Sequence, residues 1–172
     1  MRRVVIATGL LVLGGSSPVM SASVGAPPTT AELMAAPHQF VDSVDQGKFD
    51  LAAAVLTADA TIIDEFPPHT WSGPDAFKHW GADYDATSKA AHMTNSHVKL
   101  GDPLVAEAEG DVAYVVAAAS ETYKQDGKAM AETARMAFAL RREGGVWKIT
   151  AFAWAGREPH LKGAGAAKKP RP

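Results

Sequence analysis

The stretch that decides the fold runs from Ala134 to Trp154 and reads ARMAFALRREGGVWKITAFAW. Its first half alternates Met136, Phe138 and Leu140 with arginine and alanine. This period of two predicts a strand with one broad apolar face. The Gly-Gly pair that follows can turn the chain, because glycine accepts positive φ without steric cost.

A second alternating run returns after this turn. It places Trp147, Ile149 and Ala151 on one face and Lys148, Thr150 and Phe152 on the other. Together the two runs predict an antiparallel hairpin that is long enough to begin a curved sheet.

The rest of the chain predicts cover for that sheet and further strands. Helical spacing or helix-start signals occur at residues 31–47, 49–56 and 74–86, and strand patterns occur at 60–66, 93–100, 104–109, 112–123, 130–142 and 146–155. Because the helices come before a meander of strands, we expect one α+β domain: a strongly curved antiparallel sheet wrapped around three N-terminal helices. Such a sheet, covered on its concave side, leaves a cone-shaped interior.

The composition excludes several classes of function. The chain has 172 residues, of which 47% are apolar and 21% charged, so a packed domain is expected. It has no cysteine, which excludes disulfides, thiol nucleophiles and cysteine-ligated zinc. No histidine pair has the helical spacing of a zinc motif and no glycine loop suits a phosphate, so no metal and no cofactor are expected.

The charge is unevenly distributed along the chain. Between residues 30 and 160, 11 Lys and Arg stand against 19 Asp and Glu, a net charge of about −8. A body of this charge has no electrostatic footprint for nucleic acid or for an anionic membrane surface.

The two ends predict processing and solvation rather than fold. Two arginines, an apolar run over residues 4–13 and small residues up to Ala26 predict a secretory signal peptide over residues 1–26. The protein is therefore expected to be exported, periplasmic or secreted, without membrane contact after cleavage; a retained anchor is the alternative. Residues 27–32 are expected to be a flexible lead-in, 33–158 the domain, and 159–172 a disordered Gly/Ala/Lys/Pro tail.

Three segments carry a family resemblance. They are GKFDLAAAVLTADATIID at residues 47–64, WSGPDAF at residues 71–77 and GGVWKIT at residues 144–150. Over about residues 33–156 the chain resembles the NTF2-like superfamily, in its SnoaL-like and ketosteroid-isomerase-like branch. The resemblance implies the cone fold, but the superfamily includes isomerases, cyclases, dehydratases, hydrolases and proteins without a known reaction.

The resemblance also implies positions for catalytic groups. Asp64 matches the general base of the isomerases. The first-helix tyrosine and late-strand aspartate that hold the oxyanion in those enzymes correspond to Phe40 and a position near Met136, and neither side chain present here can donate a hydrogen bond to an enolate. The familiar isomerase mechanism is therefore not expected.

The candidate site combines these acids with aromatic residues. We expect Asp64 to be catalytic, helped by His69, because a carboxylate among aromatic side chains can take a proton and histidine titrates near neutrality. The expected ligand-binding residues are Phe40, Trp71, Trp80, Tyr84, Tyr123, Phe138 and Trp154. The alternative for each aromatic residue is simple core packing. Glu65 is expected on the opposite side of the strand from Asp64, and Glu132 is expected in water.

Two functions remain open at this point. One is an exported enzyme of acid–base type, without metal or covalent intermediate, that binds a small apolar molecule, cyclic or carbonyl-bearing. The other is a non-catalytic ligand-binding or dimerisation module of the cell envelope. Small residues in the strands over 112–120 and 135–141 would let two sheets approach, so a homodimer through the sheet face is expected in either case.

Overall fold

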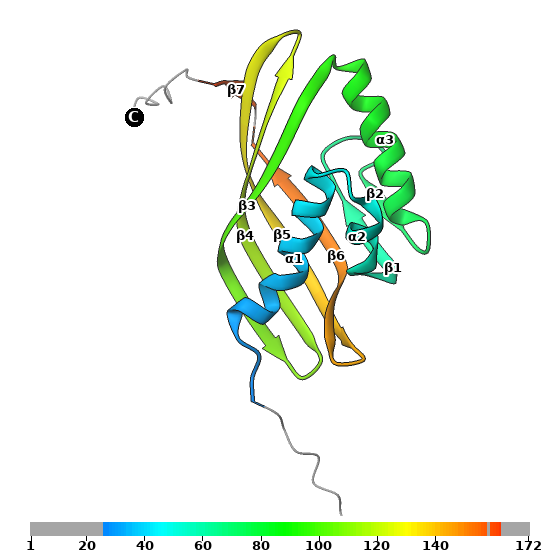
Figure 1. Ribbon diagram of the computed structural model, residues 1–172, viewed down its shortest axis with the longest axis vertical. Helices are drawn as coiled ribbons and strands as arrows, with labels where there is room; N and C mark the ends of the chain where they lie inside the picture. Colours follow the sequence, from blue (N-terminus) through cyan, green and yellow to red (C-terminus); the bar gives the residue numbers. More distant parts are fainter. Residues whose placement is uncertain (1–25, 158, 163–172) are drawn as a thin grey trace, which may run out of the picture.

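The computed structural model describes residues 26–157 and 159–162 (Figure 1). Its elements, in chain order, are α1 Thr30–Asp45, α2 Phe49–Ala54, β1 Leu56–Ile63, β2 Thr70–Ser72, α3 Ala76–Ala90, β3 Met93–Glu109, β4 Val112–Gln125, β5 Lys128–Glu143, β6 Val146–Gly156 and β7 His160–Leu161. The predicted signal peptide lies outside the described residues, apart from its last position. Among the described residues, no helix is long and apolar enough to cross a membrane.

One sheet organises the described chain. Its strands follow the order β2-β1-β6-β5-β4-β3, and β7 pairs with β5 beside this path. The long strands β3, β4 and β5 curve, while α1 lies against the sheet and α3 stands beside its upper half (Figure 1). The predicted α+β architecture is confirmed. The sheet is mixed rather than wholly antiparallel, because β1 runs parallel to β6.

A β-bulge in β6 corrects the predicted hairpin. Leu140 pairs with Ile149, but Ala139 pairs with Ala151, so Thr150 is an extra residue without a partner in β5. An extra residue reverses which side chains face inward beyond it. Phe152 is therefore 3% exposed on the inner face, where simple alternation had placed it on the outer one.

The helix starts follow local signals with small offsets. A capping box between Thr29 and Glu32 begins α1 at Thr30, inside the segment predicted as a lead-in. The other offset concerns α3, which begins at Ala76 after the N-cap Asp75, two residues later than predicted. The residues just before it, Thr70–Ser72, form β2 and pair with the end of β1.

The strands at the other end of the chain also differ from expectation. Residues 93–109 form one strand, with register shifts on both sides of Pro103 in place of a break. The segment predicted as a disordered tail contributes β7, whose Leu161 pairs with Met130. Residues 163–172 of the tail lie outside the described chain. The expected homodimer stays a prediction.

The core lies between α1 and the inner face of the sheet. Phe138 in the middle of β5 is fully buried, and its ring lies 6.3 Å from that of Phe152.

We expect Phe138→Ala to lower the free energy of unfolding by about 3–5 kcal/mol, because it removes a large ring from a closed core. Urea unfolding followed by circular dichroism measures this. Val146→Ala, at a side chain that is 62% exposed, is the control, expected to change the value by less than about 0.5 kcal/mol. Equal effects of the two changes would contradict this view of the core.

Candidate functional site

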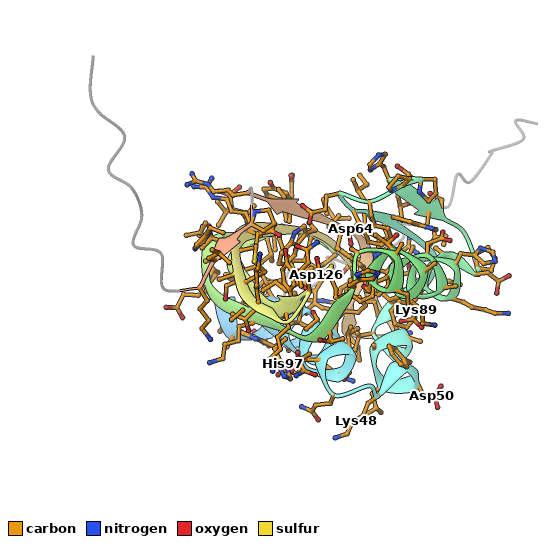
Figure 2. The ribbon with its side chains drawn as sticks, turned by 90° about the horizontal axis from the view of Figure 1, so that it is seen from above. Lys48, Asp50, Asp64, Lys89, His97 and Asp126 are labelled. Carbon is orange, nitrogen blue, oxygen red and sulfur yellow. The ribbon has the colours of Figure 1, made fainter. Side chains whose placement is uncertain are left out.

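A cavity of about 560 Å³ opens between α1, α2, α3 and the inner face of the sheet. Five of the residues singled out from the sequence line it: Phe40, Asp64, Trp80, Tyr84 and Trp154. Seen from above, Asp64 lies within the outline of the molecule, whereas Asp50 of α2 lies at its edge (Figure 2). The cavity thus gathers residues from the first helix, the first strand, the third helix and the last long strand.

Asp64 directly follows the last residue of β1 and is partly buried. Trp80 Nε1 donates a hydrogen bond to its Oδ2 (2.9 Å), and the Glu65 amide donates to its Oδ1 (2.8 Å). Burial raises the pKa of Asp64 above its ordinary value, and the hydrogen bonds from Trp80 and from the Glu65 amide partly offset this. Asp64 is therefore a fixed carboxyl group that holds a proton more readily than a free aspartate does.

An aromatic wall faces this acid. Phe77, Trp80 and Tyr84 lie three and four residues apart on α3, which puts them on one side of the helix. Their neighbouring rings are nearly parallel, with centroids 5.7 Å and 5.8 Å apart. Phe152 meets Trp80 edge-on at 6.0 Å and lies 4.7 Å from Phe40. Each ring of the wall therefore packs against at least one other ring.

Glu121, a residue that the sequence reasoning missed, adds a second acid to the cavity wall. It is 8% exposed, and its Oε1 accepts hydrogen bonds from the hydroxyls of Tyr84 (3.2 Å) and Ser96. Burial raises the pKa of Glu121, and burial and the nearby carboxylate raise that of Tyr84 to about 12. A signal for it existed, because Glu121 shares the inward face of β4 with Val115, Ala117 and Ala119.

Two more acids meet at the edge of the cavity: Glu65, which lines it, and Glu132. Glu132 was expected in water, and this prediction is wrong, because its side chain is 2% exposed. Its Oε1 accepts a hydrogen bond from Trp154 Nε1 (3.2 Å). Glu132 also stands opposite Glu121 in the pairing of β4 with β5. Glu65 lies past the end of β1, where strand alternation no longer sets its direction, and it reaches toward Glu132. A side chain at Gly156 would overlap Glu132 Oε1 and come 2.5 Å from Glu65 Oε2, so glycine makes room for this carboxyl pair.

Burial and then mutual repulsion raise the pKa values of these acids. Partial burial and then the charges of Glu132, Asp64 and Glu121 raise the pKa of Glu65 from its usual 4.5 to about 7. Burial is also the main cause of the raised pKa of Glu132. Asp64, Glu65, Glu121 and Glu132 therefore share one corner of the fold, the acidic corner, and the pKa of each is raised above its ordinary value.

The other residues singled out from the sequence lie away from the cavity lining. The exposed ring of His69 meets the backbone oxygen of Asp64 (3.1 Å) through Nδ1, rather than its carboxylate. Trp71 is buried behind Phe66 and donates to Asp83 Oδ2 (2.8 Å), which ties β2 to α3. Tyr123 and Phe138 are 7% and 0% exposed. Their predicted roles in catalysis or ligand binding stay predictions.

The donor set bears on metal binding as well. Within residues 26–157 and 159–162, no group of three His, Asp or Glu side chains is placed to hold a metal ion. The carboxyl groups of Asp64, Glu121 and Glu132 accept hydrogen bonds from Trp, Tyr and Ser side chains.

Comparison with known proteins gives the family. The sequence profile of the SnoaL-like domain matches residues 33–152, so the chain belongs to the SnoaL-like family of the NTF2-like superfamily, as the resemblance implied. A search of the curated proteins found no match.

Solved structures share the fold at low identity. A hexachlorocyclohexane dehydrochlorinase, LinA-type3, from Novosphingobium barchaimii LL02 is 14% identical, with 82% of this chain and 94% of that one covered and a TM-score of 0.66. The Kfla4162 protein from Kribbella flavida is 19% identical, with 76% and 91% covered and a TM-score of 0.62. A ketosteroid isomerase-like protein from Erwinia carotovora atroseptica SCRI1043 is 16% identical, with 76% and 97% covered and a TM-score of 0.59. These likenesses establish the fold.

The raised pKa of Glu65 predicts how stability depends on pH. Between about pH 4.5 and 7 the folded chain binds a proton there more tightly than the unfolded chain, so stability is highest below this window and falls as the pH rises through it. We therefore expect the melting temperature of the wild type to fall between pH 5 and pH 8. The Glu132→Gln variant should show a smaller fall, because the substitution removes one charge that repels Glu65. The glutamine can still accept the hydrogen bond from Trp154. Thermal melts followed by circular dichroism measure both.

Glu109→Gln is the matched control for this experiment, because it removes an exposed carboxylate at the end of β3. It should leave the pH dependence as in the wild type. Two results would contradict the coupling of Glu65 to Glu132. One is a wild-type melting temperature that is the same at pH 5 and pH 8. The other is a pH dependence of Glu132→Gln that parallels that of the wild type.

Proposed function

We propose that this protein binds a small apolar molecule, cyclic or carbonyl-bearing, in its cavity, and that Asp64 exchanges a proton with it. One observation carries the proposal: a partly buried carboxyl group with a raised pKa lines an aromatic cavity and is held in one orientation by Trp80. A cavity of about 560 Å³ suits a small organic molecule. Membership of the SnoaL-like family is consistent with such binding.

The arrangement favours acid–base chemistry in a specific way. Trp80 Nε1 fixes Asp64 Oδ2, so the carboxyl group keeps its direction when a ligand enters. A pKa raised by burial makes the carboxylate a stronger base, and a general base is most effective when its pKa approaches the working pH. The ring faces of the wall would hold a flat or cyclic body against it.

A second candidate function, binding without turnover, is favoured by a different observation. Phe40 and Met136 both line the cavity, and neither offers a hydrogen-bond donor. A reaction that builds negative charge on a substrate oxygen lacks stabilisation at these two places. The protein would then be a carrier or sensor for the same class of molecule.

Native mass spectrometry of protein purified from its own host provides the ligand, and Asp64→Asn then separates the two functions. We expect the substitution to lower turnover of that ligand by about 10²–10⁴-fold, because Asn keeps the hydrogen bond from Trp80 but cannot take the proton. Asp102→Asn, at an exposed position within β3, is the control and should act as wild type. Turnover by Asp64→Asn at the wild-type rate would refute proton exchange, and a bound ligand that even the wild type leaves unchanged would establish the carrier.

We also propose that the protein is exported by cleavage of its N-terminal segment. The support is the sequence alone: two arginines, an apolar run and small residues up to Ala26. Intact mass measurement of the protein from its host should give a chain that begins between residues 22 and 27, recovered from the periplasm or the medium. A chain that begins at residue 1 or 2 in the cytoplasm would contradict export, and one that does so in the membrane would indicate the retained anchor.

A further inference from the structure

We infer that the ligand of this cavity is an organic cation, in which an ammonium group is attached to an apolar body. The inference rests on the proposed function, since it takes the cavity to be a small-molecule site, and it adds the charge of the molecule. It is carried by the side chains that line the cavity and by the one deeply buried acid among them.

The cavity lining is strongly one-sided in charge. Six acidic residues of the described chain line it: Asp45, Asp50, Asp64, Glu65, Asp85 and Glu121. One basic residue, Lys78, lines it as well. Asp50 and Asp85 are exposed and so lie toward the solvent side, as does Asp45, which is 3.4 Å from His97. A concave site lined by charge of one sign concentrates ions of the opposite sign. The field of this cavity therefore draws cations and repels anions.

The four acids of the corner take part in none of the ion pairs of the described chain. The ion pairs of the described chain join His92 to Asp126, His97 to Asp45, Arg141 to Asp59 and Glu143, and Arg142 to Asp111. None of them includes Asp64, Glu65, Glu121 or Glu132. A buried carboxylate without a partner charge is costly, and an incoming ammonium group would supply that charge.

Glu121 points most directly to a missing partner. It is more than nine-tenths buried and lines the cavity, yet both of its hydrogen bonds, from Tyr84 and Ser96, go to Oε1. Its Oε2 accepts none from the described residues. A carboxylate oxygen with free lone pairs in a cavity wall is a place for a donor or a positive group on the ligand.

The aromatic wall suits the same kind of ligand. Trp80 and Tyr84 lie beside Asp64 and Glu121, since each donates a hydrogen bond to one of them. Indole and phenol faces attract ammonium groups, most strongly where water is excluded. The rings would also pack the apolar body. A metal ion fits less well, because no three potential ligands of the described chain are placed to hold one.

A matched pair of probes tests the inference on the intact protein. The probes are (4-hydroxyphenyl)trimethylammonium and 4-tert-butylphenol, which have the same shape and differ in one positive charge. Isothermal titration calorimetry at pH 7.5 should give at least about tenfold tighter binding of the cation. Glu121→Gln should reduce this preference by about tenfold and leave binding of the neutral probe within about twofold of the wild type. Glu109→Gln, which removes a carboxylate outside the cavity, should preserve the preference.

The outcomes separate this inference from the proposed function. If the neutral probe binds as tightly as the cation or more tightly, the charge inference is overturned while small-molecule binding stands. If neither probe binds at millimolar concentration, the inference is overturned as well, and the co-purified ligand decides the proposed function independently. Should Glu121→Gln fail to fold by circular dichroism, the two probes on the wild-type protein still decide.

Discussion

The hydrogen bond from Trp80 Nε1 to Asp64 Oδ2 joins the third helix to the end of the first strand, and the cavity depends on it. The same helix takes part in two further hydrogen bonds of this kind: its Asp83 accepts from Trp71 of β2, and its Tyr84 donates to Glu121 of β4. Each joins an aromatic donor to a carboxylate in another segment of the chain. The helix is thus fixed at a distance from the sheet by polar contacts at its inner face, and a hollow remains where full apolar packing would have closed it.

Much of the fold was predictable, because period-two patterns survive in the long strands and turn residues separate them. The bulge at Thr150 was not, since alanines at 151 and 153 let the alternation of Trp147 and Ile149 be continued in the wrong phase, and the pairing of Ile149 and Ala151 with β5 is what locates the extra residue. Its effect is large, because it turns Phe152 inward and thereby supplies the ring that meets both Phe40 and Trp80. A single unpaired residue therefore places one of the central rings of the aromatic lining.

The site was partly predictable for a similar reason. Asp64, Trp80 and Tyr84 follow from local pattern and family resemblance. Glu121 and Glu132 lie on inward faces that the alternation defines, yet a glutamate on such a face is ordinarily expected to reach water. That these two stand opposite each other, and that Glu65 joins them, depends on strand register and on the direction of the chain after β1. Neither can be read from spacing alone. The acidic corner, rather than the fold, is what distinguishes the site of this chain chemically.

Gly156 carries a consequence for how this corner can vary. The carboxyl groups of Glu65 and Glu132 fill the volume that a β-carbon would occupy on the last long strand. Any other amino acid there would have to displace one acid toward solvent, even though the strand itself would tolerate it. The glycine and the two glutamates are therefore coupled sterically: a larger residue at position 156 would separate the carboxyl groups of Glu65 and Glu132 and so disperse their charge.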